Sequence, residues 1–575
     1  MIRKILRAGD KSDDRSDLDA LHPVLKRVYL NRSITRREEI GLGLDKLLPP
    51  GLLGGLEQAA ELVCEVMTGN GRILVVGDFD ADGATSTALA IKALTAMGAG
   101  NVGYLVPNRF EYGYGLTPEI VRDALERSPD LIITVDNGVS SHEGVAVARS
   151  AGVSVLVTDH HLPGQELPDA DAIVNPNCSG DPFPSKHLAG VGVVFYLMAA
   201  VRARLTDSGW FRDRQTAPPN LASYLDLVAL GTVADVVPLD QNNRILVHQG
   251  LQRIRSGRCC MGIQALLEVG GKNRLACVAS DLGFSTGPRL NAAGRLDDMS
   301  LGIECLLSDD YATAMDIART LDGLNRQRRE IEAEMQQQAV AELEEISFAD
   351  RMPTGICLYR KGWHQGIIGI LAARIKERLH RPVIAFAQAE EQGMLKGSAR
   401  SIPGLHMRDT LDEVAKAHPL LLSKFGGHAM AAGLSIREAD LEWFSSAFDE
   451  CVRNRLGESE LQGVIHSDGS LESSQLNLEL ANLLRDGGPW GQGFPEPLFD
   501  NRFRVLSYRI LGEKHLKMVL QLPDGGDTID AIAFNQAEDT DLSTGEVIEA
   551  AYRLDVNEFR GRCTAQLIVE QLEAV

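Results

Sequence analysis

The stretch RILVVGDFDADG, residues 72–83, decides the fold of the first half of the chain. It joins a short apolar run, rich in β-branched residues, to three closely spaced aspartates and a glycine. Comparable apolar runs lie at 101–107, 130–135, 153–158 and 171–176, and segments of helical character separate them. Buried strands that alternate with amphipathic helices are typical of βαβ units. The sequence therefore predicts an α/β fold built on a parallel sheet.

Acidic residues stand directly after four apolar runs of this region. They are Asp78, Asp80 and Asp82 after ILVVG, Asp136 after LIITV, Asp159 after VSVLVT, and Asp235 after LVALGTVA, and two histidines, His160 and His161, follow Asp159. In an open parallel sheet, ligands bind at the carboxyl ends of the strands. If each run is a strand, the side chains that follow the strands converge on one point.

The DFDADG segment has the chemistry of a divalent-cation site. Three carboxylates at positions i, i+2 and i+4 repel one another, and a divalent cation relieves the repulsion. Carboxylate oxygens with one or two imidazoles suit Mg²⁺ or Mn²⁺, and a shared carboxylate such as Asp136 could bridge two ions about 3.5–4 Å apart. Gly83 permits a tight turn into a helix that is expected to begin near Ala84. The pattern also occurs in calcium loops, but Leu89 stands where an EF-hand loop has its glutamate.

Taken singly, the other acidic positions have simpler explanations. Asp136 alone could be an ordinary turn at the end of a strand, the Asp-His-His triplet a surface loop, and Asp235 a helix cap. All of these positions together, in a parallel-sheet pattern, favour a metal site.

The composition excludes both a single small domain and a disordered chain. The 575 residues suggest three or four domains, and hydrophobic residues make up 44% of the chain, enough for large cores. Acidic residues outnumber basic ones by 79 to 58, so the net charge is -21, and the basic character typical of nucleic-acid-binding proteins is absent. Residues 456–575 carry 21 acidic and 9 basic side chains, which predicts a separate unit.

The cysteines and the N-terminus favour a cytoplasmic protein. The nine cysteines form no CxxC pair, so reduced, buried thiols are expected rather than disulfides or a zinc site. The N-terminal MIRKILRAGD lacks the apolar core of a signal peptide. No run approaches the roughly 20 apolar residues that cross a bilayer, so no membrane contact is expected.

Five consecutive parts are expected along the chain. They are a helical lead-in at 1–50 with a capping box at Thr35–Glu38, a parallel-sheet domain at 51–308, a long connecting helix at 309–350, a smaller α/β domain at 351–455, and a small antiparallel β-barrel at 456–575. The connecting helix is predicted from the segment 311–346, which has no proline and exceeds the length that one domain needs. The alternative is an ordinary core helix that breaks near Gly323.

Short motifs are spread over nearly the whole chain. They are VGDFDADG (76–83), VPNRFEYGYGL (106–116), TVDNG (134–138), TDHH (158–161), NPN (175–177), GVGVVFYL (190–197), GTVADVVPL (231–239), GPRLNAAGRL (287–296), WHQGIIGI (363–370), KGSARS (396–401) and GGHAMAAG (426–433). Together they resemble the DHH phosphoesterase superfamily, which is named after the Asp-His-His triplet. The resemblance implies a parallel-sheet DHH domain, a smaller α/β DHHA1 domain that binds substrate, a long helix that joins them, and a C-terminal barrel of the OB-fold type.

The resemblance also implies which side chains carry the chemistry. It assigns as ligands of two Mn²⁺ or Mg²⁺ ions Asp80, Asp82, Asp136, His160 and Asp235, with Asp136 as the bridge. Asp78 is either a further ligand or a support for the ligands. His161 is expected to contact the scissile phosphate or an ion. The catalytic set is therefore Asp82, Asp136, His160 and His161.

Basic residues outside this cluster are expected to hold the substrate. By resemblance, the residues that bind a 5′-phosphate are Arg109, Ser398 and Arg400, and a guanidinium beside a hydroxyl suits phosphate oxygens. Arg289 and Arg295 would line the entrance. The alternative for each arginine is a solvated surface charge. His428, among small residues, would contact phosphate near the metals, and its alternative is a buried core histidine.

The partner of the C-terminal barrel stays open at this point. A net charge of -12 over residues 456–575 is unusual for an OB-fold that binds single strands. A DNA contact would need a local basic stripe made of Arg502, Arg504, Arg509, Lys514 and Lys517, and a protein-docking role is equally consistent. The resemblance implies a single-strand-binding protein and a RecQ-type helicase as partners, and a monomeric chain.

The function that the resemblance implies is that of a single-stranded-DNA-specific 5′-to-3′ exonuclease. Such an enzyme releases 5′-mononucleotides by two-metal phosphodiester hydrolysis, in DNA repair and recombination. Two alternatives remain. A DHH enzyme that hydrolyses short oligonucleotides, a cyclic dinucleotide or pyrophosphate would generally lack the barrel. A non-catalytic replication scaffold would have lost metal ligands that this sequence keeps.

Overall fold

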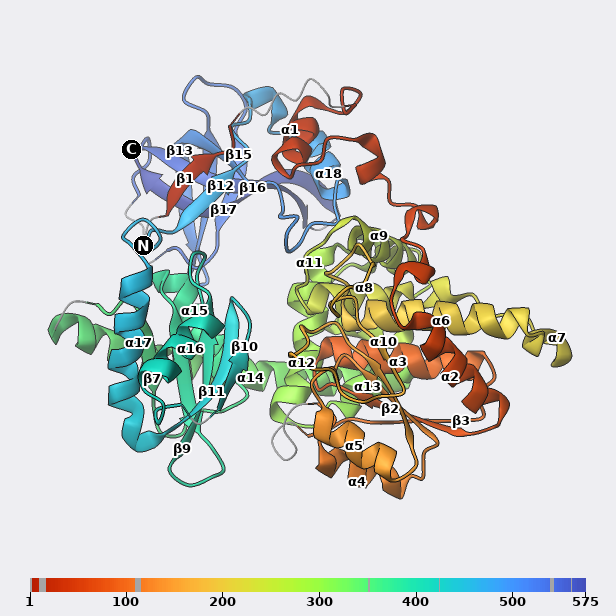
Figure 1. Cartoon of the computed structure of the whole chain (residues 1–575). Coiled ribbons are helices and arrows are strands. Elements are labelled where there is room, and N and C mark those ends of the chain that lie inside the picture. Colours follow the sequence, from red (N-terminus) through yellow and green to blue (C-terminus); the bar gives the residue numbers. More distant parts are fainter. Residues whose placement is uncertain are drawn as a thin grey trace. The chain divides into compact units, whose positions relative to one another are not determined.

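The computed structural model describes residues 3–9, 17–108, 115–349, 352–422, 424–537, 542–559 and 561–575. The chain forms two compact units. The first unit comprises Asp10–Asn325 and Asn482–Pro497, and the second comprises Met1–Gly9, Arg326–Ala481 and Leu498–Val575. Each unit has its own β-structure (Figure 1).

A five-stranded parallel sheet forms the centre of the first unit. Its order is β3-β2-β4-β5-β6, with β2 Arg72–Gly77, β3 Asn101–Leu105, β4 Leu131–Val135, β5 Ser154–Thr158 and β6 Ala172–Val174. All neighbouring strands run parallel, so the strands predicted in this region are confirmed. The strand order reverses at β2, because the chain leaves it first for β3 on one side and later for β4 on the other. Ligands of open α/β sheets bind at such a switch point.

Helices cover both faces of this sheet (Figure 1). On one face lie α2 Leu56–Thr68, α3 Ala81–Ala96 and α6 Gly190–Asp207, and on the other lie α4 Pro118–Glu126 and α5 His142–Ser150. Leu74 and Ile132 of the strands share a buried cluster with Ile120 of α4 and Val145 of α5. Because both faces are buried, each strand is a continuous apolar run in the sequence.

The apolar run 227–234 was expected to be a strand like the others, and this is wrong. It belongs to helix α8, Leu225–Ala234. Four consecutive residues, 227–230, are all buried, so the helix is apolar all round and its sequence resembles that of a buried strand. Asp235 is the C-cap residue of α8. The fourth acidic position therefore reaches the sheet edge from the end of a helix.

The rest of the first unit is mainly helical. Its further elements are α1 Pro23–Asn31, α7 Trp210–Asp213, α9 Gln241–Arg255, α10 Met261–Val269, α11 Ala279–Asp281, the π-helical turn η6 Leu282–Thr286, α12 Gly287–Leu296 and α13 Ser300–Leu307. The capping box predicted at Thr35–Glu38 is wrong. The turn there is a 3₁₀ helix, Arg37–Ile40, that starts later, so Glu39 instead accepts hydrogen bonds from the backbone N–H groups of Thr35 (3.1 Å) and Arg36 (2.8 Å).

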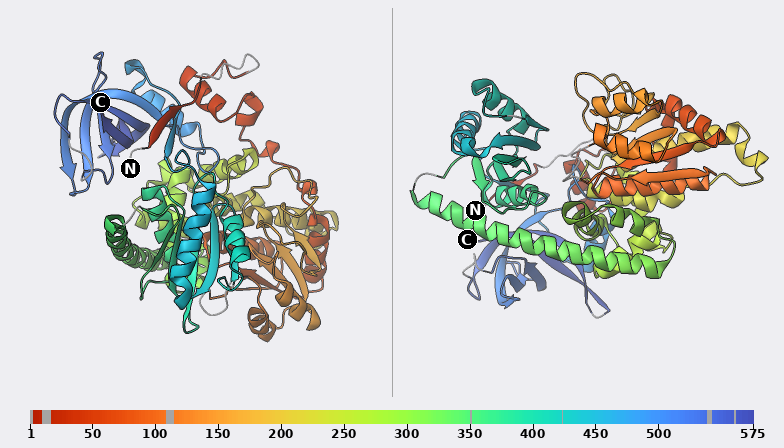
Figure 2. Two further views of the ribbon diagram at one scale, coloured as in Figure 1. Left: turned by 60° about the vertical axis from the view of Figure 1, so that its left-hand side comes forward. Right: turned by 90° about the horizontal axis from the view of Figure 1, so that it is seen from below.

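The long helix predicted after the first domain is confirmed. Helix α14, Tyr311–Ala349, has 39 residues and continues without a break through Gly323 (Figure 2). The boundary between the two compact units falls within it, between Asn325 and Arg326. Among the described residues, no helix combines the length and the apolar character needed to cross a membrane.

A mixed sheet forms the α/β part of the second unit. Its order is β10-β11-β9-β8-β7, with β7 Ile356–Tyr359, β8 Val383–Gln388, β9 Met394–Arg400, β10 Lys424–Gly427 and β11 Ala431–Arg437. Only β7 and β8 are parallel to each other. The helices of this part are α15 Ile368–Leu379, α16 Met407–Ala417 and α17 Leu441–Arg455. The predicted second α/β region is therefore present.

A closed five-stranded barrel forms the C-terminal part of the second unit. Its order is β13-β14-β15-β17-β16, with β13 Phe499–Leu511, β14 His515–Gln521, β15 Ile529–Ala533, β16 Val547–Phe559 and β17 Arg562–Ala574. The expectation of a purely antiparallel barrel is wrong, because β15 and β17 pair in parallel where the barrel closes. Near the barrel in sequence are β12 Val464–Ser467 and α18 Leu478–Asp486. β12 pairs in parallel with β1, Lys4–Arg7, a strand that the helical lead-in prediction missed.

Candidate metal centre

Three strands of the parallel sheet end side by side. Gly77 at the end of β2 is in register with Val135 at the end of β4, and Val135 is in register with Thr158 at the end of β5. In each case the next residue is an aspartate. Three carboxylates from segments far apart in the sequence therefore enter one region at the sheet edge.

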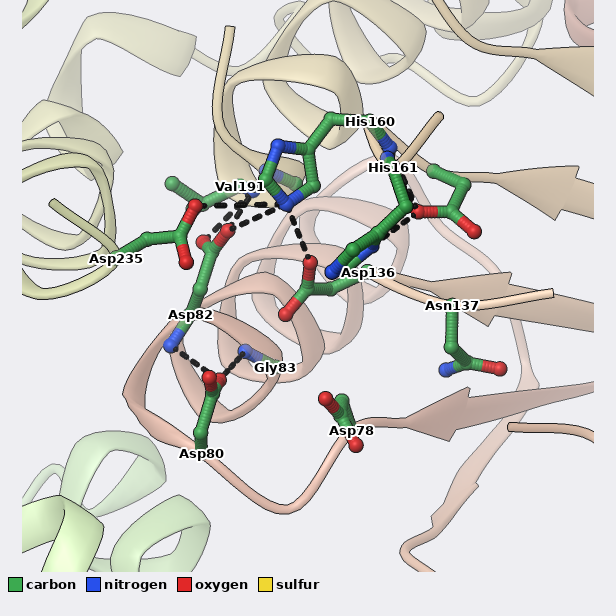
Figure 3. Close-up of polar contacts among 12 residues, drawn as sticks. Asp78, Asp80, Asp82, Gly83, Asp136, Asn137, His160, His161, Val191 and Asp235 are labelled. Atoms are coloured by element: carbon green, nitrogen blue, oxygen red, sulfur yellow. Dashed lines mark hydrogen bonds and ion pairs between the residues drawn. The ribbon is translucent and has the colours of Figure 1, made fainter. Parts of the chain in front are cut away.

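Seven side chains form one cluster there (Figure 3). Three groups have possible ligand atoms within 4.8 Å of one another, namely Asp136 with His160 and His161, Asp82 with His160 and Asp235, and Asp78 with Asp80 and Asp136. Asp136 and His160 each belong to two groups, so the three groups are parts of one site. These seven residues are the ones that the sequence analysis selected for metal binding and catalysis.

The DFDADG segment forms a helix N-terminus. Asp80 caps α3, and its Oδ1 accepts hydrogen bonds from the N–H groups of Asp82 (2.9 Å) and Gly83 (3.0 Å). Helix α3 begins at Ala81, three residues earlier than expected from the sequence, so Asp82 lies in its first turn. The partial positive charge of a helix N-terminus stabilises carboxylates at these positions.

Asp82 is almost completely enclosed, with 1% of its surface exposed. Its two oxygens accept hydrogen bonds from the N–H groups of Gly190 (2.7 Å) and Val191 (3.0 Å), at the start of α6. Glycine is needed on both neighbouring helices, because a Cβ on Gly190 would lie 2.7 Å from the Asp136 Cβ and a Cβ on Gly231 would lie 2.7 Å from the Asp82 Oδ1. Helices α6 and α8 therefore pack directly against these carboxylates.

Asp136 follows β4 with a left-handed backbone conformation, φ 62°. Aspartate and asparagine adopt this conformation more readily than most residues. The His160 Nε2 atom lies 3.0 Å from the Asp136 Oδ1, 3.4 Å from the Asp235 Oδ2 and 4.0 Å from the Asp82 Oδ2 (Figure 3). One imidazole therefore faces carboxylates that come from β4, α8 and α3.

Asp159 orients the two histidines. Its Oδ1 accepts hydrogen bonds from the backbone N–H groups of His160 (2.7 Å) and His161 (3.0 Å) and lies 2.8 Å from the His161 Nδ1. Burial alone would raise the pKa of Asp159, but the hydrogen bond and charge of His161 outweigh it and lower that pKa. Burial alone would lower the pKa of His161, and Asp159 raises it instead. The pair therefore holds the imidazole with Nδ1 toward Asp159.

Two asparagines that the sequence analysis left without a role support the same loop. The Nδ2 of Asn175 donates a hydrogen bond to the His161 carbonyl oxygen (2.9 Å), and the Nδ2 of Asn177 donates one to the His160 carbonyl oxygen (2.6 Å). Both follow β6, the next strand of the sheet. Their NPN motif was the available signal, because it stands at the carboxyl end of an apolar run like the acidic residues do.

The buried carboxylates of the cluster repel one another. Burial raises the pKa of Asp82 to about 7, and the charge of Asp80 adds to the effect. Burial and then the neighbouring carboxylates, Asp82 first, raise the pKa values of Asp136 and Asp235 well above the ordinary value. A divalent cation would remove this cost by supplying opposite charge. Carboxylate oxygens with imidazole nitrogens fit Mn²⁺ or Mg²⁺.

Comparison with known proteins agrees with this geometry. Family models match at residues 72–232 (DHH family, N-terminal domain), 353–454 (DHHA1 domain) and 467–571 (RecJ OB domain). The single-stranded-DNA-specific exonuclease RecJ of Dickeya dadantii (strain 3937) is 56% identical over 558 residues, which cover 96% of each chain. RecJ of Escherichia coli (strain K12) is 54% identical over 565 residues, which cover 97% of each chain. The chain belongs to the RecJ family.

Solved structures of this family have the same fold. The crystal structure of RecJ from Thermus thermophilus in complex with Mn²⁺ matches with a TM-score of 0.78 at 32% identity, covering 96% of this chain and 76% of that one. The complex of the same protein with Mg²⁺ matches with a TM-score of 0.73 at 30% identity, covering 96% and 75%. The predicted fold class, a DHH domain, a DHHA1 domain and an OB-type barrel, is confirmed. The predicted ions, Mn²⁺ or Mg²⁺, are the ions in these RecJ structures.

Arg289 and Arg295 of α12 differ in their surroundings. The guanidinium of Arg289 is buried, with Nη2 2.9 Å from the Asp322 Oδ1, and its Nε and Nη1 donate hydrogen bonds to the same oxygen (3.0 Å) and to the Ser285 carbonyl oxygen (2.7 Å). These contacts favour a structural role for Arg289 over the predicted place at a substrate entrance. Arg295 is partly exposed near the end of α12, and its substrate role stays a prediction.

Three further residues selected for the substrate site, Ser398, Arg400 and His428, lie in the second unit. Ser398 and Arg400 lie two positions apart on β9, so their side chains share one face of the strand. The Arg400 Nη1 donates a hydrogen bond to the Ser398 Oγ (3.1 Å). His428 is exposed between β10 and β11, so the alternative of a buried core histidine is wrong. The phosphate contacts of these three residues stay predictions. Arg109 lies outside the described residues.

Proposed function

We infer that this chain is a single-stranded-DNA-specific exonuclease that depends on divalent cations. The observation that carries the inference is the cluster of five carboxylates and two histidines at the carboxyl edge of the DHH sheet. Identity of 54–56% to RecJ proteins over nearly their whole length supports the same activity. A non-catalytic scaffold would have no use for buried acids that repel one another, since such groups lower stability unless a ligand balances them.

We propose that the reaction is phosphodiester hydrolysis at two metal ions, with Asp136 as the shared ligand. Ions held by these residues would polarise the phosphate and lower the pKa of the attacking water. Asp136 belongs both to the group with Asp78 and Asp80 and to the group with the histidines, so it links the two halves of the site. The N–H groups at the start of α6 hold Asp82 in one orientation, and Asp159 does the same for His161.

We propose that hydrolysis proceeds from a 5′ end and releases 5′-mononucleotides. Burial lowers the pKa of Arg400, and within the described residues no carboxylate forms an ion pair with its guanidinium. The Arg400 Nη1 donates to the Ser398 Oγ and to the Ala399 carbonyl oxygen (2.8 Å). Gly369, in the first turn of α15, adjoins both side chains, because a Cβ there would lie 2.9 Å from the Arg400 Nη2 and from the Ser398 Oγ. A guanidinium, a hydroxyl and a helix N-terminus together suit a terminal phosphate.

We also propose the cellular setting that the family resemblance implies. It is DNA repair and recombination in the cytoplasm, by a monomer that works with a single-strand-binding protein and a RecQ-type helicase. The barrel supports a nucleic-acid contact only locally. Arg502 and Arg504 are exposed on one side of β13, but Glu549 is paired opposite Arg502 on β16.

Digestion of a single strand labelled at its 5′ end, with and without Mn²⁺, tests the proposed function. We expect the labelled mononucleotide to be the first product, and only when Mn²⁺ is present. Cleavage without metal, or early release of a label placed at the 3′ end, would contradict the proposal. A dinucleotide and a cyclic dinucleotide serve as comparison substrates, and faster hydrolysis of either would favour the short-substrate alternative.

A further inference from the structure

We infer that Phe284, together with Val236, forms a surface beside the metal centre on which a base of the single-stranded substrate stacks. The inference rests on the function proposed above. It gives Phe284 and Val236 a role in the preference for single-stranded over duplex DNA.

Phe284 is unusually exposed for an aromatic residue. Among the described residues of the first unit it is the most exposed large hydrophobic side chain, at 81%. It lies in the π-helical turn η6, in which Leu282, Ser285 and Thr286 are buried. Turns of this kind are rare and are frequently found at functional sites. The buried neighbours anchor the turn, while Phe284 faces solvent.

Val236 is also unusually exposed for an apolar residue. It directly follows Asp235 of the metal centre, and 62% of its surface is exposed. Its φ of 61° is a conformation that β-branched residues rarely adopt. Backbone strain of this kind persists where the surroundings enforce it, often at functional sites. The chain therefore places an apolar side chain in solvent one residue after a metal-site carboxylate.

The turn that carries Phe284 packs against the end of α8, which leads to Val236. A Cβ on Gly283 would lie 3.1 Å from the Val233 Cγ1, and a Cβ on Gly287 would lie 3.0 Å from the Ala234 Cβ. The two glycines flank the segment that contains Phe284. Close packing of η6 on the last turn of α8 therefore ties the aromatic residue to the stretch of chain that bears Asp235 and Val236.

Helix α12 continues η6 and is joined to the opposite side of the metal centre. The Asn291 Oδ1 accepts a hydrogen bond from the Ala81 N–H (2.8 Å), at the start of α3. A Cβ on Gly294 would lie 1.8 Å from the Phe79 carbonyl oxygen, in the DFDADG segment. The segment η6–α12 therefore contacts both the DFDADG segment, which bears Asp78, Asp80 and Asp82, and the end of α8, which leads to Asp235.

The chemistry of this surface suits a nucleobase. A single strand presents anionic phosphates, which go to cations, and flat base faces, which stack on aromatic side chains. In a duplex the base faces are already covered by their neighbours, so they are not available to Phe284. An aromatic side chain beside the metal centre therefore contributes more to the binding of a single strand than to the binding of a duplex.

The test compares the variants Phe284→Ala and Phe284→Trp with the unaltered full-length protein in Mn²⁺. The substrates are a 5′-phosphorylated single strand and the same strand with abasic sites at its first three nucleotides. On the normal strand, Phe284→Ala is expected to have a kcat/KM about tenfold below that of the unaltered protein, mainly through a higher KM, because the stacking contact with one base is lost. Phe284→Trp is expected to stay near the unaltered protein. On the abasic strand, the unaltered protein and Phe284→Ala should be equal, because the base is missing.

The control is Leu275→Ala, which removes another exposed apolar side chain of the first unit (68% exposed) and should change neither substrate's kcat/KM. Equal kcat/KM of Phe284→Ala and the unaltered protein on the normal strand would overturn the inference and favour a protein as the occupant of this surface. A loss of the same size on the abasic strand would overturn it too, since it would reveal a structural effect. If the unaltered protein cleaves neither strand, the proposed function itself fails, and the inference falls with it.

Discussion

The carboxyl edge of the parallel sheet buries carboxylates, whereas strand β9 of the second unit carries a partly buried guanidinium. At the sheet edge, Asp82 and Asp136 are each 1% exposed and lie among further carboxylates. On β9, Arg400 has the hydroxyl of Ser398 and a carbonyl oxygen as its hydrogen-bond partners. Buried charges that the protein does not balance are costly, and they are retained where a ligand supplies the opposite charge. The first region suits a cation, and the second suits a phosphate.

Arg289 shows the contrasting case. Its guanidinium is buried as well, but Asp322 balances it within the same unit at 2.9 Å. Arg289 has a carboxylate partner, whereas the hydrogen-bond partners of Arg400 are a hydroxyl and a carbonyl oxygen. The kind of partner, more than the degree of burial, therefore distinguishes a structural charge from one that is available to a ligand.

The strongest test of the comparison removes the carboxylate shared within the cluster. Asp136→Ala is expected to lower exonuclease kcat at least about 1,000-fold, because loss of a shared ligand removes several kcal/mol of transition-state stabilisation. Binding of single-stranded DNA, measured by fluorescence anisotropy in Ca²⁺, should stay near that of the unaltered protein. Near-normal Mn²⁺-dependent cleavage by this variant would show that the site is assigned wrongly.

The next test concerns the balanced charge. Arg289→Met should lower the free energy of unfolding by about 3–5 kcal/mol, because it leaves Asp322 as a buried charge without its partner. Urea unfolding of the variant measures the loss. The double variant Arg289→Met, Asp322→Asn should recover most of it, and an unchanged stability of the single variant would rule out the structural role.

The unbalanced charge on β9 predicts a different result. Arg400→Met should reduce the preference for a 5′-phosphate over a 5′-hydroxyl end about 10- to 100-fold, since a hydrogen bond to a charged group contributes about 1.5–3 kcal/mol. Rates on the two kinds of end provide the measurement. Lys396→Met is the matched control, because Lys396 is exposed on the same strand. A preference that survives in Arg400→Met would remove β9 from the 5′-phosphate site.

The smallest effect concerns stability without metal. The pKa of Asp136 is raised in the folded state, so ionisation costs the folded protein stability as pH rises above about 4 toward that pKa. Asp136→Asn removes this cost, and asparagine tolerates the left-handed backbone. In EDTA at pH 8 the variant should unfold at a higher temperature than the unaltered protein, and the difference should vanish near pH 4.

Saturating Mn²⁺ at pH 8 should reverse this order, because only the unaltered protein keeps the shared ligand. Thermal unfolding followed by circular dichroism measures both conditions. A variant less stable than the unaltered protein in EDTA at pH 8 would contradict the view that the carboxylates repel one another.

The strands of the parallel sheet could be predicted because apolar runs such as 72–77 have turn residues at their ends. The same rule failed at 227–234, because a helix buried on all sides has no apolar stripe and resembles a buried strand. It also missed β1 and its pairing with β12, since Lys4 and Val464 meet across most of the length of the chain. Parallel pairing of β15 with β17 depends on how the barrel closes, which no local pattern encodes.

The seven residues of the metal centre were found because acidic and imidazole side chains are rare directly after apolar runs. The groups that position them were not found. Gly190 and Val191 contribute backbone N–H groups, which any sequence possesses, and Asn177 acts on a carbonyl oxygen. Arg289 was selected for its charge, and only the structure revealed Asp322 as its partner.

By itself, the sequence determined which kinds of side chain stand at the ends of the strands, because strand burial and turn chemistry are local properties of the chain. Only the tertiary structure decided which atoms meet. The carboxylates meet at one site because of the register of Gly77, Val135 and Thr158, the position of Asp235 at the end of α8 and the left-handed backbone of Asp136. These features arise from packing between segments far apart in the chain, so no single stretch of sequence contains them.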